Sequence, residues 1–344
     1  MKQQIRTGLC SFGLSGKIFH VPFLQSNPGF KITKVLERTK ENSKTILPEA
    51  KIAKDFKELL DDQDLDLLIV NTPNHLHYPM AKEALLSGKH VLVEKPFTVL
   101  VEEGKELITL ANDKKLVLTV YQNRRLDSDF KTVKKILSEN ILGKVKLFES
   151  QIFRWKPDLG NKLWKINANK GAGLLYDLGS HLIDQALVLF GMPNSLFADL
   201  RKLRKGAEVD DYFELQLFYN EFKVTLKSSL LASDPGHRFI IQGDKACYTK
   251  FGNDPQEEDL MGGAIPSTKN WGMEDEFLWG IVHAEQDSFS YPSLNGSYPE
   301  FFENLYHAIV DREPLIVKPE EALDVIRIIE LANISFSEKR MVEV

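Results

Sequence analysis

The stretch Gly8-Leu9-Cys10-Ser11-Phe12-Gly13-Leu14-Ser15-Gly16 separates an apolar segment from an amphipathic one, and it predicts the fold of the first third of the chain. Its spacing matches the glycine fingerprint of a dinucleotide-binding βα turn, with Ser11 in the place of the first glycine. The later two glycines, Gly13 and Gly16, would let the backbone approach a pyrophosphate and the helix pack on the strand. Together with the glycines, Phe12, Leu14 and Ser15 are therefore candidate cofactor-binding residues.

Residues 1–124 alternate short apolar runs with amphipathic segments. The expected strands are Ile5–Cys10, Lys31–Leu36, Leu65–Val70, His90–Val93 and Leu116–Val120, and the expected helices are Gly16–Gln25, Asp55–Asp61, Tyr78–Ser87 and Val101–Asn112. Alternation of strands and helices at this spacing is typical of a parallel, doubly wound sheet. We therefore expect an α/β protein with a Rossmann dinucleotide-binding domain over residues 1–124.

The pattern changes after Tyr121, where strands follow one another without intervening helices. The expected elements are a helix at Phe130–Asn140, strands at Lys144–Phe153, Ser195–Leu203, Tyr212–Tyr219, Lys223–Leu231 and Arg238–Gln242, and helices at Pro299–Val310 and Pro319–Ser337. Consecutive strands favour antiparallel pairing, so residues 125–344 are expected to form an α+β domain on a mostly antiparallel sheet. The segment Asn253–Ser297 has no clear period and is predicted to be a long loop near the active-site mouth or at an interface.

Composition excludes several classes of protein. No apolar run approaches the roughly 20 residues that cross a bilayer, and a formal net charge of −5 argues against a nucleic-acid partner. The N-terminus enters a strand-like segment directly, without a signal or transit pattern, and Cys10 and Cys247 are too few for a disulfide scaffold. We expect a cytoplasmic protein.

Polar residues near the ends of expected strands give further cofactor candidates. Glu37 lies about twenty residues beyond Gly16, where an acidic side chain accepts hydrogen bonds from ribose hydroxyls. Such a carboxylate repels the 2′-phosphate of NADP, whereas the adjacent Arg38 could receive it, so both cofactors remain open and Glu37 slightly favours NAD. Thr72-Pro73-Asn74 and His77 follow the next strand. His75 and His77 have no acidic or cysteine cluster with them, so no metal site is expected.

Three residues carry candidate chemistry. Lys95 follows a strand of the Rossmann pattern, beside the expected nicotinamide, where an ammonium can stabilise a developing alkoxide. Asp177 and His181 are four residues apart; on a helix they share a face, so that the carboxylate can orient an imidazole that accepts the substrate's proton. Asp184 shares that face and is either a supporting partner of this pair or a buried polar contact to neighbouring backbone.

Taken together, these motifs resemble the Gfo/Idh/MocA oxidoreductases, the glucose–fructose oxidoreductase and inositol dehydrogenase family, over nearly the whole chain. The resemblance rests on the glycine turn, on Thr72-Pro73-Asn74 with His77, on Glu94-Lys95-Pro96, on Tyr121-Gln122-Asn123-Arg124-Arg125, and on Asp177 with His181. It is nearest to the scyllo-inositol dehydrogenase-like members, through residues 13–22 and 176–181. Many of those prefer NADP, and Glu37 departs from the small residue that such members usually carry.

The resemblance implies roles for these residues. His181 would be the general acid/base, Lys95 would polarise the substrate oxygen, and Asp177 would position substrate and histidine. Glu94, Gln122 and Asn123 join the cofactor site by their places in the motifs. The Lys95–Pro96 bond is often cis in such segments, a geometry that would aim the lysine into the cleft.

Substrate and partners follow from the resemblance as expectations. The substrate would be a sugar or cyclic polyol. Arg154, Trp155 and Asp158 follow the first expected strand of the second domain and either line the sugar pocket or belong to core and rim, and His237 is a further pocket candidate. The family's large open sheet commonly packs against a twin, so that alternating apolar strands, such as 213–217, would face a partner in a homodimer or homotetramer. Alternatives are another reductase on this scaffold, of the imine or biliverdin type, a glycosidase that uses transient oxidation, and a non-catalytic NAD(P) sensor. The sensor should have lost Lys95, Asp177 and His181, and the sequence retains them.

Overall fold

The structure is a computed structural model that describes residues 4–160, 170–266 and 270–344. The chain divides into two compact units, and it visits each of them more than once. Unit 1 comprises Met1–Asn123, Gln256–Trp271 and Ser297–Leu323, and unit 2 comprises Arg124–Pro255, Gly272–Gly296 and Asp324–Val344. The functions expected for the two parts of the sequence, dinucleotide binding and substrate binding with oligomerisation, are taken up below as proposals.

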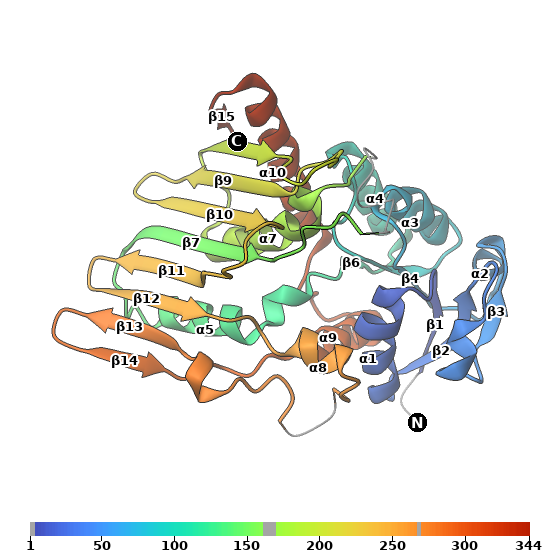
Figure 1. The fold of residues 1–344 in the computed structure, drawn as a ribbon. Helices are drawn as coiled ribbons and strands as arrows, with labels where there is room; N and C mark the ends of the chain where they lie inside the picture. Colours follow the sequence, from blue (N-terminus) through green and yellow to red (C-terminus); the bar gives the residue numbers. More distant parts are fainter. Residues whose placement is uncertain (1–3, 161–169, 267–269) are drawn as a thin grey trace. The chain divides into compact units, whose positions relative to one another are not determined.

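Unit 1 contains the parallel sheet that the sequence predicts (Figure 1). Its strands are β1 (Ile5–Leu9), β2 (Phe30–Leu36), β3 (Lys51–Ala53), β4 (Leu67–Val70), β5 (His90–Val93) and β6 (Leu118–Val120), in the order β3-β2-β1-β4-β5-β6. All pairs are parallel. Every residue of β4 is buried, as expected for a central strand covered on both faces. This is the doubly wound Rossmann arrangement, and the prediction of it is confirmed.

The helices of unit 1 connect these strands. They are η1, a π-helical turn (Gly16–His20), α1 (Val21–Ser26), α2 (Lys57–Leu60), α3 (His77–Leu86) and α4 (Val101–Lys114), with α8 (Gln256–Met261) and α9 (Pro299–Val310) from later in the chain. Phe302 of α9 stacks on Phe23 of α1, with ring centroids 5.2 Å apart, and Tyr298 contacts the same ring edge-on. An aromatic cluster thus joins the late segments to the first helix of the sheet.

Unit 2 is built on a nine-stranded sheet in the order β14-β13-β12-β11-β7-β10-β9-β8-β15. Its strands are β7 (Val145–Phe153), β8 (Ser195–Arg201), β9 (Tyr212–Phe218), β10 (Lys223–Ser229), β11 (His237–Gly243), β12 (Ala246–Phe251), β13 (Gly280–Ala284), β14 (Ser288–Tyr291) and β15 (Val342–Glu343). The pairs are antiparallel except β10 with β7, so the mostly antiparallel sheet is confirmed.

Helices α5 (Ser128–Ser138), α7 (Ser180–Phe190) and α10 (Pro319–Glu338) lie on one side of this sheet (Figure 1). The apolar residues of β9, Phe213, Leu215 and Leu217, are fully buried inside their own chain. Alternation along β9 turns these side chains towards the covered face and Glu214 and Gln216 towards the other, so the apolar side chains themselves do not face a partner. That the strand faces a partner through its other side stays a prediction.

The expectation of a structureless loop over 253–297 is also corrected. The segment contains α8, a 3-10 turn η6 (Glu276–Leu278) and the hairpin β13–β14, while residues 267–269 lie outside the described residues. The hairpin extends the edge of the sheet by pairing with β12. Its strands are short and mostly exposed, so backbone pairing rather than an apolar period specifies them, and composition gave no signal for it.

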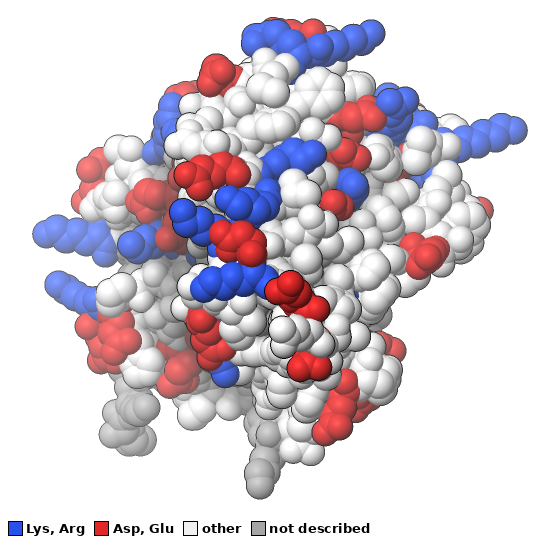
Figure 2. Space-filling model, turned by 90° about the vertical axis from the view of Figure 1, so that its left-hand side faces the viewer, with Lys and Arg blue, Asp and Glu red and all other residues white. Residues whose placement is uncertain are grey.

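Two surface properties bear on partners. In the parts of the chain that the structure describes, no helix is both long and apolar enough to cross a membrane. Figure 2 shows basic and acidic side chains interspersed over one face. Charged side chains on the nine-stranded sheet form ion pairs, such as Lys227 with Glu149 at 3.5 Å and Arg201 with Asp199 at 2.8 Å.

Candidate active site

In unit 1, the glycine turn is fastened to the end of β4 by a pair of residues. The Asn71 side chain accepts a hydrogen bond from Ser11 N at 2.9 Å and donates one to Ser11 O at 3.0 Å, and Ser11 Oγ donates to Asn71 O at 2.7 Å. A Cβ on Gly16 would lie 2.8 Å from both Ser11 O and Asn71 Nδ2, whereas a Cβ on Gly13 would meet nothing within 4 Å. Gly16 is therefore needed for packing, and Gly13 leaves open space in front of the turn.

Glu94, at the end of β5, is tied to the first helical turn. It is 9 % exposed; its Oε1 accepts a hydrogen bond from Ser15 Oγ and lies 2.8 Å from His20 Nε2. Burial alone would raise the pKa of Glu94, but the hydrogen bonds of His20 and Ser15 outweigh it and lower the pKa to about 2. The His20 ring in turn packs on Tyr121, with centroids 4.9 Å apart. His20 was not among the predicted site residues, although it lies in the stretch 13–22 that carries the resemblance.

His77 was predicted to contact the cofactor, but both of its ring nitrogens contact backbone oxygens of the chain. The ring is fully buried, with Nδ1 2.8 Å from Pro96 O and Nε2 2.9 Å from Thr72 O. Both nitrogens are thus engaged with backbone, and the ring connects the residues that follow β4 to those that follow β5.

Lys95 follows β5 and is half-buried, and the Lys95–Pro96 peptide bond is cis, as the resemblance implied. The rest of the turn and strand-end set is distributed over the same carboxyl edge of the sheet. Phe12 and Ser15 are half-buried and Leu14 is half exposed in the glycine turn; Thr72, Pro73 and Asn74 are half-buried after β4; and Asn123 is buried after β6.

Glu37 has a local role that its position did not predict. Its carboxylate accepts hydrogen bonds from Asn42 N at 2.9 Å, from Ser43 N at 2.9 Å and from Ser43 Oγ at 2.5 Å, and the residue is 8 % exposed. It thereby anchors the turn η2 (Asn42–Thr45). Arg38 is exposed beside it.

The residues at this edge fit a dinucleotide. Gln122 is 1 % exposed, and neither its amide nitrogen nor its amide oxygen has a partner among the described residues; the same holds for the hydroxyl of Thr72. Buried polar groups are rarely left unsatisfied, so a polar ligand or water is the expected partner. The open space in front of Gly13 adds room for a pyrophosphate.

In unit 2, Asp177 and His181 lie on consecutive helical segments, Asp177 in the π-helical turn η5 (Leu175–Gly179) and His181 in α7. His181 is 4 % exposed and Asp177 is half-buried. Asp184, on the same helix, accepts hydrogen bonds from Arg125 Nε at 2.8 Å and Nη2 at 2.7 Å. No sequence pattern indicated this two-point ion pair, which holds α7 against the segment that contains Arg125.

The start of η5 is held by Asp210, a residue that the sequence analysis missed. Its backbone oxygen accepts a hydrogen bond from Leu174 N at 2.9 Å, and its carboxylate accepts one from Leu175 N at 2.7 Å. Burial raises the pKa of Asp210 to about 6, although these backbone hydrogen bonds oppose the rise. No local pattern connects Asp210 with the turn that carries Asp177, because only the fold brings Asp210 to Leu174 and Leu175.

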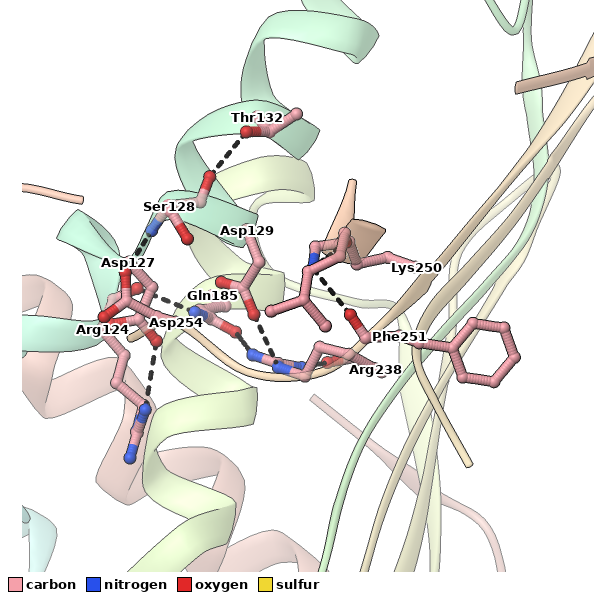
Figure 3. Close-up of polar contacts among 12 residues, drawn as sticks. Arg124, Asp127, Ser128, Asp129, Thr132, Gln185, Arg238, Lys250, Phe251 and Asp254 are labelled. Carbon is pink, nitrogen blue, oxygen red and sulfur yellow. Dashed lines mark hydrogen bonds and ion pairs between the residues drawn. The ribbon is translucent and has the colours of Figure 1, made fainter. Parts of the chain in front are cut away.

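A buried polar network supports α7 from the side of the sheet (Figure 3). Arg238 Nη2 donates to Gln185 Oε1 at 2.7 Å, and Gln185 Nε2 donates to Arg124 O at 2.8 Å. Arg238 Nε also lies 3.1 Å from Asp129 Oδ2, with the two side chains 3 % and 1 % exposed. The network thus joins β11, α5 and the helix that carries His181.

The candidate substrate residues lie in unit 2, near the ends of β7 and β11. Arg154 is half-buried and bonded through its backbone to Ser229 and Ala232, Trp155 is 59 % exposed, and Asp158 is exposed. The His237 ring packs on Phe251, with centroids 3.9 Å apart. Their contact with substrate stays a prediction. Among the described residues, no group of three His, Cys, Asp or Glu side chains is placed to hold a metal ion.

The fold and the edge residues define a dinucleotide-binding protein of the Rossmann type. Residues 5–122 match the oxidoreductase family's NAD-binding Rossmann fold, and residues 134–344 match its C-terminal alpha/beta domain. The chain therefore belongs to the Gfo/Idh/MocA oxidoreductase family, as the resemblance indicated.

Several relatives extend over nearly the full length. The chain is 36 % identical to the scyllo-inositol 2-dehydrogenase (NADP(+)) of Bacillus subtilis, covering 98 % of this chain and 95 % of the relative, and 37 % identical to an uncharacterized oxidoreductase of Escherichia coli, covering 96 % of each. A crystal structure of an oxidoreductase from Bacteroides fragilis is 44 % identical with a TM-score of 0.90, covering 99 % of this chain and 100 % of that one.

Alanine substitutions at Gly16 and Gly13 should distinguish a glycine needed for packing from a glycine that leaves room for the dinucleotide. Gly16→Ala places its Cβ against the backbone of Ser11, so we expect a loss of about 1–3 kcal/mol in the free energy of unfolding. Gly13→Ala meets no protein atom, so it should leave that free energy unchanged and weaken dinucleotide binding. Denaturant unfolding and cofactor titration of both variants measure this. Equal destabilisation by the two substitutions would contradict the assignment.

Asp210 should make stability depend on pH in a defined window. Because its pKa in the folded state, about 6, lies above the ordinary value of 3.8, the folded protein holds this proton more tightly, and the group's contribution to stability falls as pH rises between those values. Asp210→Asn keeps an acceptor for Leu175 N and removes the titration. We expect the wild type to lose up to about 3 kcal/mol relative to the variant across the window, measured by denaturant unfolding. A parallel pH dependence of the two proteins would refute this.

The buried pair of Arg238 and Asp129 should be costly to break from one side. Asp129→Ala leaves the guanidinium buried without its carboxylate, so we expect a loss of about 3–5 kcal/mol. Lys57→Ala is the control, because the Lys57–Asp61 pair is 74 % and 63 % exposed and should change stability by less than about 0.5 kcal/mol. Chemical denaturation gives both values, and similar small losses would show that the buried pair is not a structural support.

Proposed function

We propose that this chain transfers a hydride between a nicotinamide cofactor and a secondary hydroxyl or ketone of a sugar or cyclic polyol. The observation that carries the proposal is the joint presence of Lys95, Asp177 and His181 at the positions that match the family's catalytic motifs. The Bacillus subtilis relative, named as a scyllo-inositol 2-dehydrogenase, supports the substrate class.

In the proposed reaction, His181 accepts the hydroxyl proton as the carbon gives up its hydride, and it returns a proton when the ketone is reduced. The Lys95 ammonium stabilises the negative charge that develops on the substrate oxygen. Asp177 orients the imidazole and the substrate. A nicotinamide held at the carboxyl edge of the parallel sheet would supply the hydride acceptor. The ion pair of Arg125 with Asp184 keeps the His181 helix in place.

For the cofactor we propose NADP(H), against the slight preference for NAD that Glu37 gave in the sequence. The carboxylate of Glu37 is engaged by residues 42–43, whereas the guanidinium of Arg38 is exposed and suited to a 2′-phosphate. The NADP(+) in the name of the Bacillus subtilis relative supports the same choice.

We also propose a homodimer or homotetramer that forms through the face of the nine-stranded sheet on which Glu214 and Gln216 lie. That face mixes half-buried aromatic residues, such as Tyr212 and Phe218, with paired charges, a composition found in protein–protein interfaces. We place the enzyme in the cytoplasm, where its two free cysteines would stay reduced.

The activity is tested by turnover with NADP⁺ over a panel of inositols and sugars. His181→Ala should lower kcat by roughly 10²–10⁴ with cofactor affinity retained, because it removes the base without touching the dinucleotide site. His283→Ala, an exposed histidine on β13, is the control and should leave kcat unchanged. Full turnover by His181→Ala or by Lys95→Ala would overturn the mechanism.

The cofactor preference is tested by titration with NADPH and NADH. Arg38→Ala should weaken NADPH binding by roughly tenfold to a hundredfold and leave NADH binding nearly unchanged, since it removes one charged hydrogen-bonding partner of the 2′-phosphate. Tighter binding of NADH than of NADPH by the wild type would restore Glu37 as the ribose anchor.

A further inference from the structure

The His77 ring has a hydrogen-bonding problem that only a second proton solves. Nδ1 lies 2.8 Å from Pro96 O and Nε2 lies 2.9 Å from Thr72 O, and both of these atoms are carbonyl acceptors. A neutral imidazole has one N–H, so its other nitrogen would point a lone pair at a carbonyl oxygen. The two contacts are both hydrogen bonds only when the ring is an imidazolium.

The contacts join two segments that matter for the proposed reaction. Thr72 follows β4 and Pro96 follows Lys95 after β5, and these neighbouring strands pair in parallel up to Val70 and Val93. The ring therefore connects Thr72, in the segment after β4 that holds cofactor candidates, to Pro96, which follows the candidate catalytic residue Lys95. Loss of either contact leaves one of these segments without that link.

Some features around the His77 ring disfavour its charged form, and others favour it. Burial lowers the pKa of His77, the two carbonyls raise it, Glu94 raises it and Lys95 lowers it. The carboxylate of Glu94 is itself bound by His20 and Ser15. His75, two residues before His77, is exposed. With burial dominant, the free protein has a neutral ring near pH 7 and makes one of the two hydrogen bonds. A dinucleotide adds the negative charge of its diphosphate at this edge, which favours the imidazolium.

We propose that His77 is a proton-dependent positioning residue: dinucleotide binding is coupled to uptake of a proton by His77, which makes both backbone contacts hydrogen bonds and fixes the segment of Lys95. This inference rests on the proposed function, because it needs a cofactor at this edge. By linkage, cofactor affinity falls as pH rises through the range in which the bound ring is charged and the free ring is not, by up to about tenfold per pH unit.

The test is calorimetric titration of NADP⁺ into the whole protein, in buffers that differ in ionisation enthalpy, at several pH values between about 5 and 8. The 2′-phosphate of NADP⁺ titrates near pH 6 and also binds protons, so the quantity of interest is the difference between wild type and variant. We expect the wild type to take up close to one proton more than His77→Gln, whose amide cannot be protonated. His75→Gln is the matched control and should take up as many protons as the wild type.

The outcomes separate the inference from the proposed function. If NADP⁺ binds and His77→Gln takes up as many protons as the wild type, the inference is wrong and the function stands. If no dinucleotide binds, the proposed function fails and the inference fails with it. Should His77→Gln not fold, ¹⁵N-histidine NMR of the wild type decides: signals from two protonated nitrogens in the His77 ring of the complex support the inference, and one protonated nitrogen overturns it.

Discussion

The exchange of hydrogen bonds between Ser11 and Asn71 holds the candidate cofactor edge of unit 1 together. The two residues are fastened at three points, through the Ser11 backbone on both sides and through its hydroxyl. The hydroxyl is what a glycine in that place would lack, so the departure from the glycine fingerprint gives the turn an additional bond to β4. With the turn fixed there, Ser15 and His20 reach Glu94 at the end of β5, and His77 spans β4 and β5. Three strand ends are thus cross-linked by side chains.

Unit 2 supports its candidate residues differently, by burying charges in pairs. Arg125 with Asp184, Arg238 with Asp129 and Lys250 with Glu274 are ion pairs in which every side chain is at most 10 % exposed. A buried charge costs several kcal/mol unless its partner is correctly placed, so each pair tolerates few alternative packings. Two of the pairs act on the His181 helix: Arg125 holds Asp184 of that helix, and Arg238 reaches it through Gln185.

A feature could be predicted when the residues that produce it lie close together along the chain, and it could not when they are brought together only by folding. The strands and helices of residues 1–124 follow from local periodicity, apart from β3, whose three residues are too few to show a pattern. The places of Lys95, Asp177 and His181 on their elements follow from motifs. The partners of Glu37 lie only five and six residues away but depend on a turn conformation, and Asp210 lies 33 residues from Asp177. Backbone acceptors such as Thr72 O and Pro96 O carry no sequence signal, which is why the position of His77 was predicted and its contacts were not.

The repeated passage of the chain between the two units has a consequence for biosynthesis. Unit 1 is complete only with residues up to Leu323, and Phe302 of α9 and Tyr298, which precedes that helix, belong to the cluster around Phe23. During translation, the first 123 residues therefore emerge without the aromatic partners that cover their first helix, and they wait for almost the entire polypeptide to leave the ribosome. Maturation of the two units is consequently nearly simultaneous, and a nascent chain stalled anywhere before α9 would present Phe23 to chaperones rather than to its native neighbours.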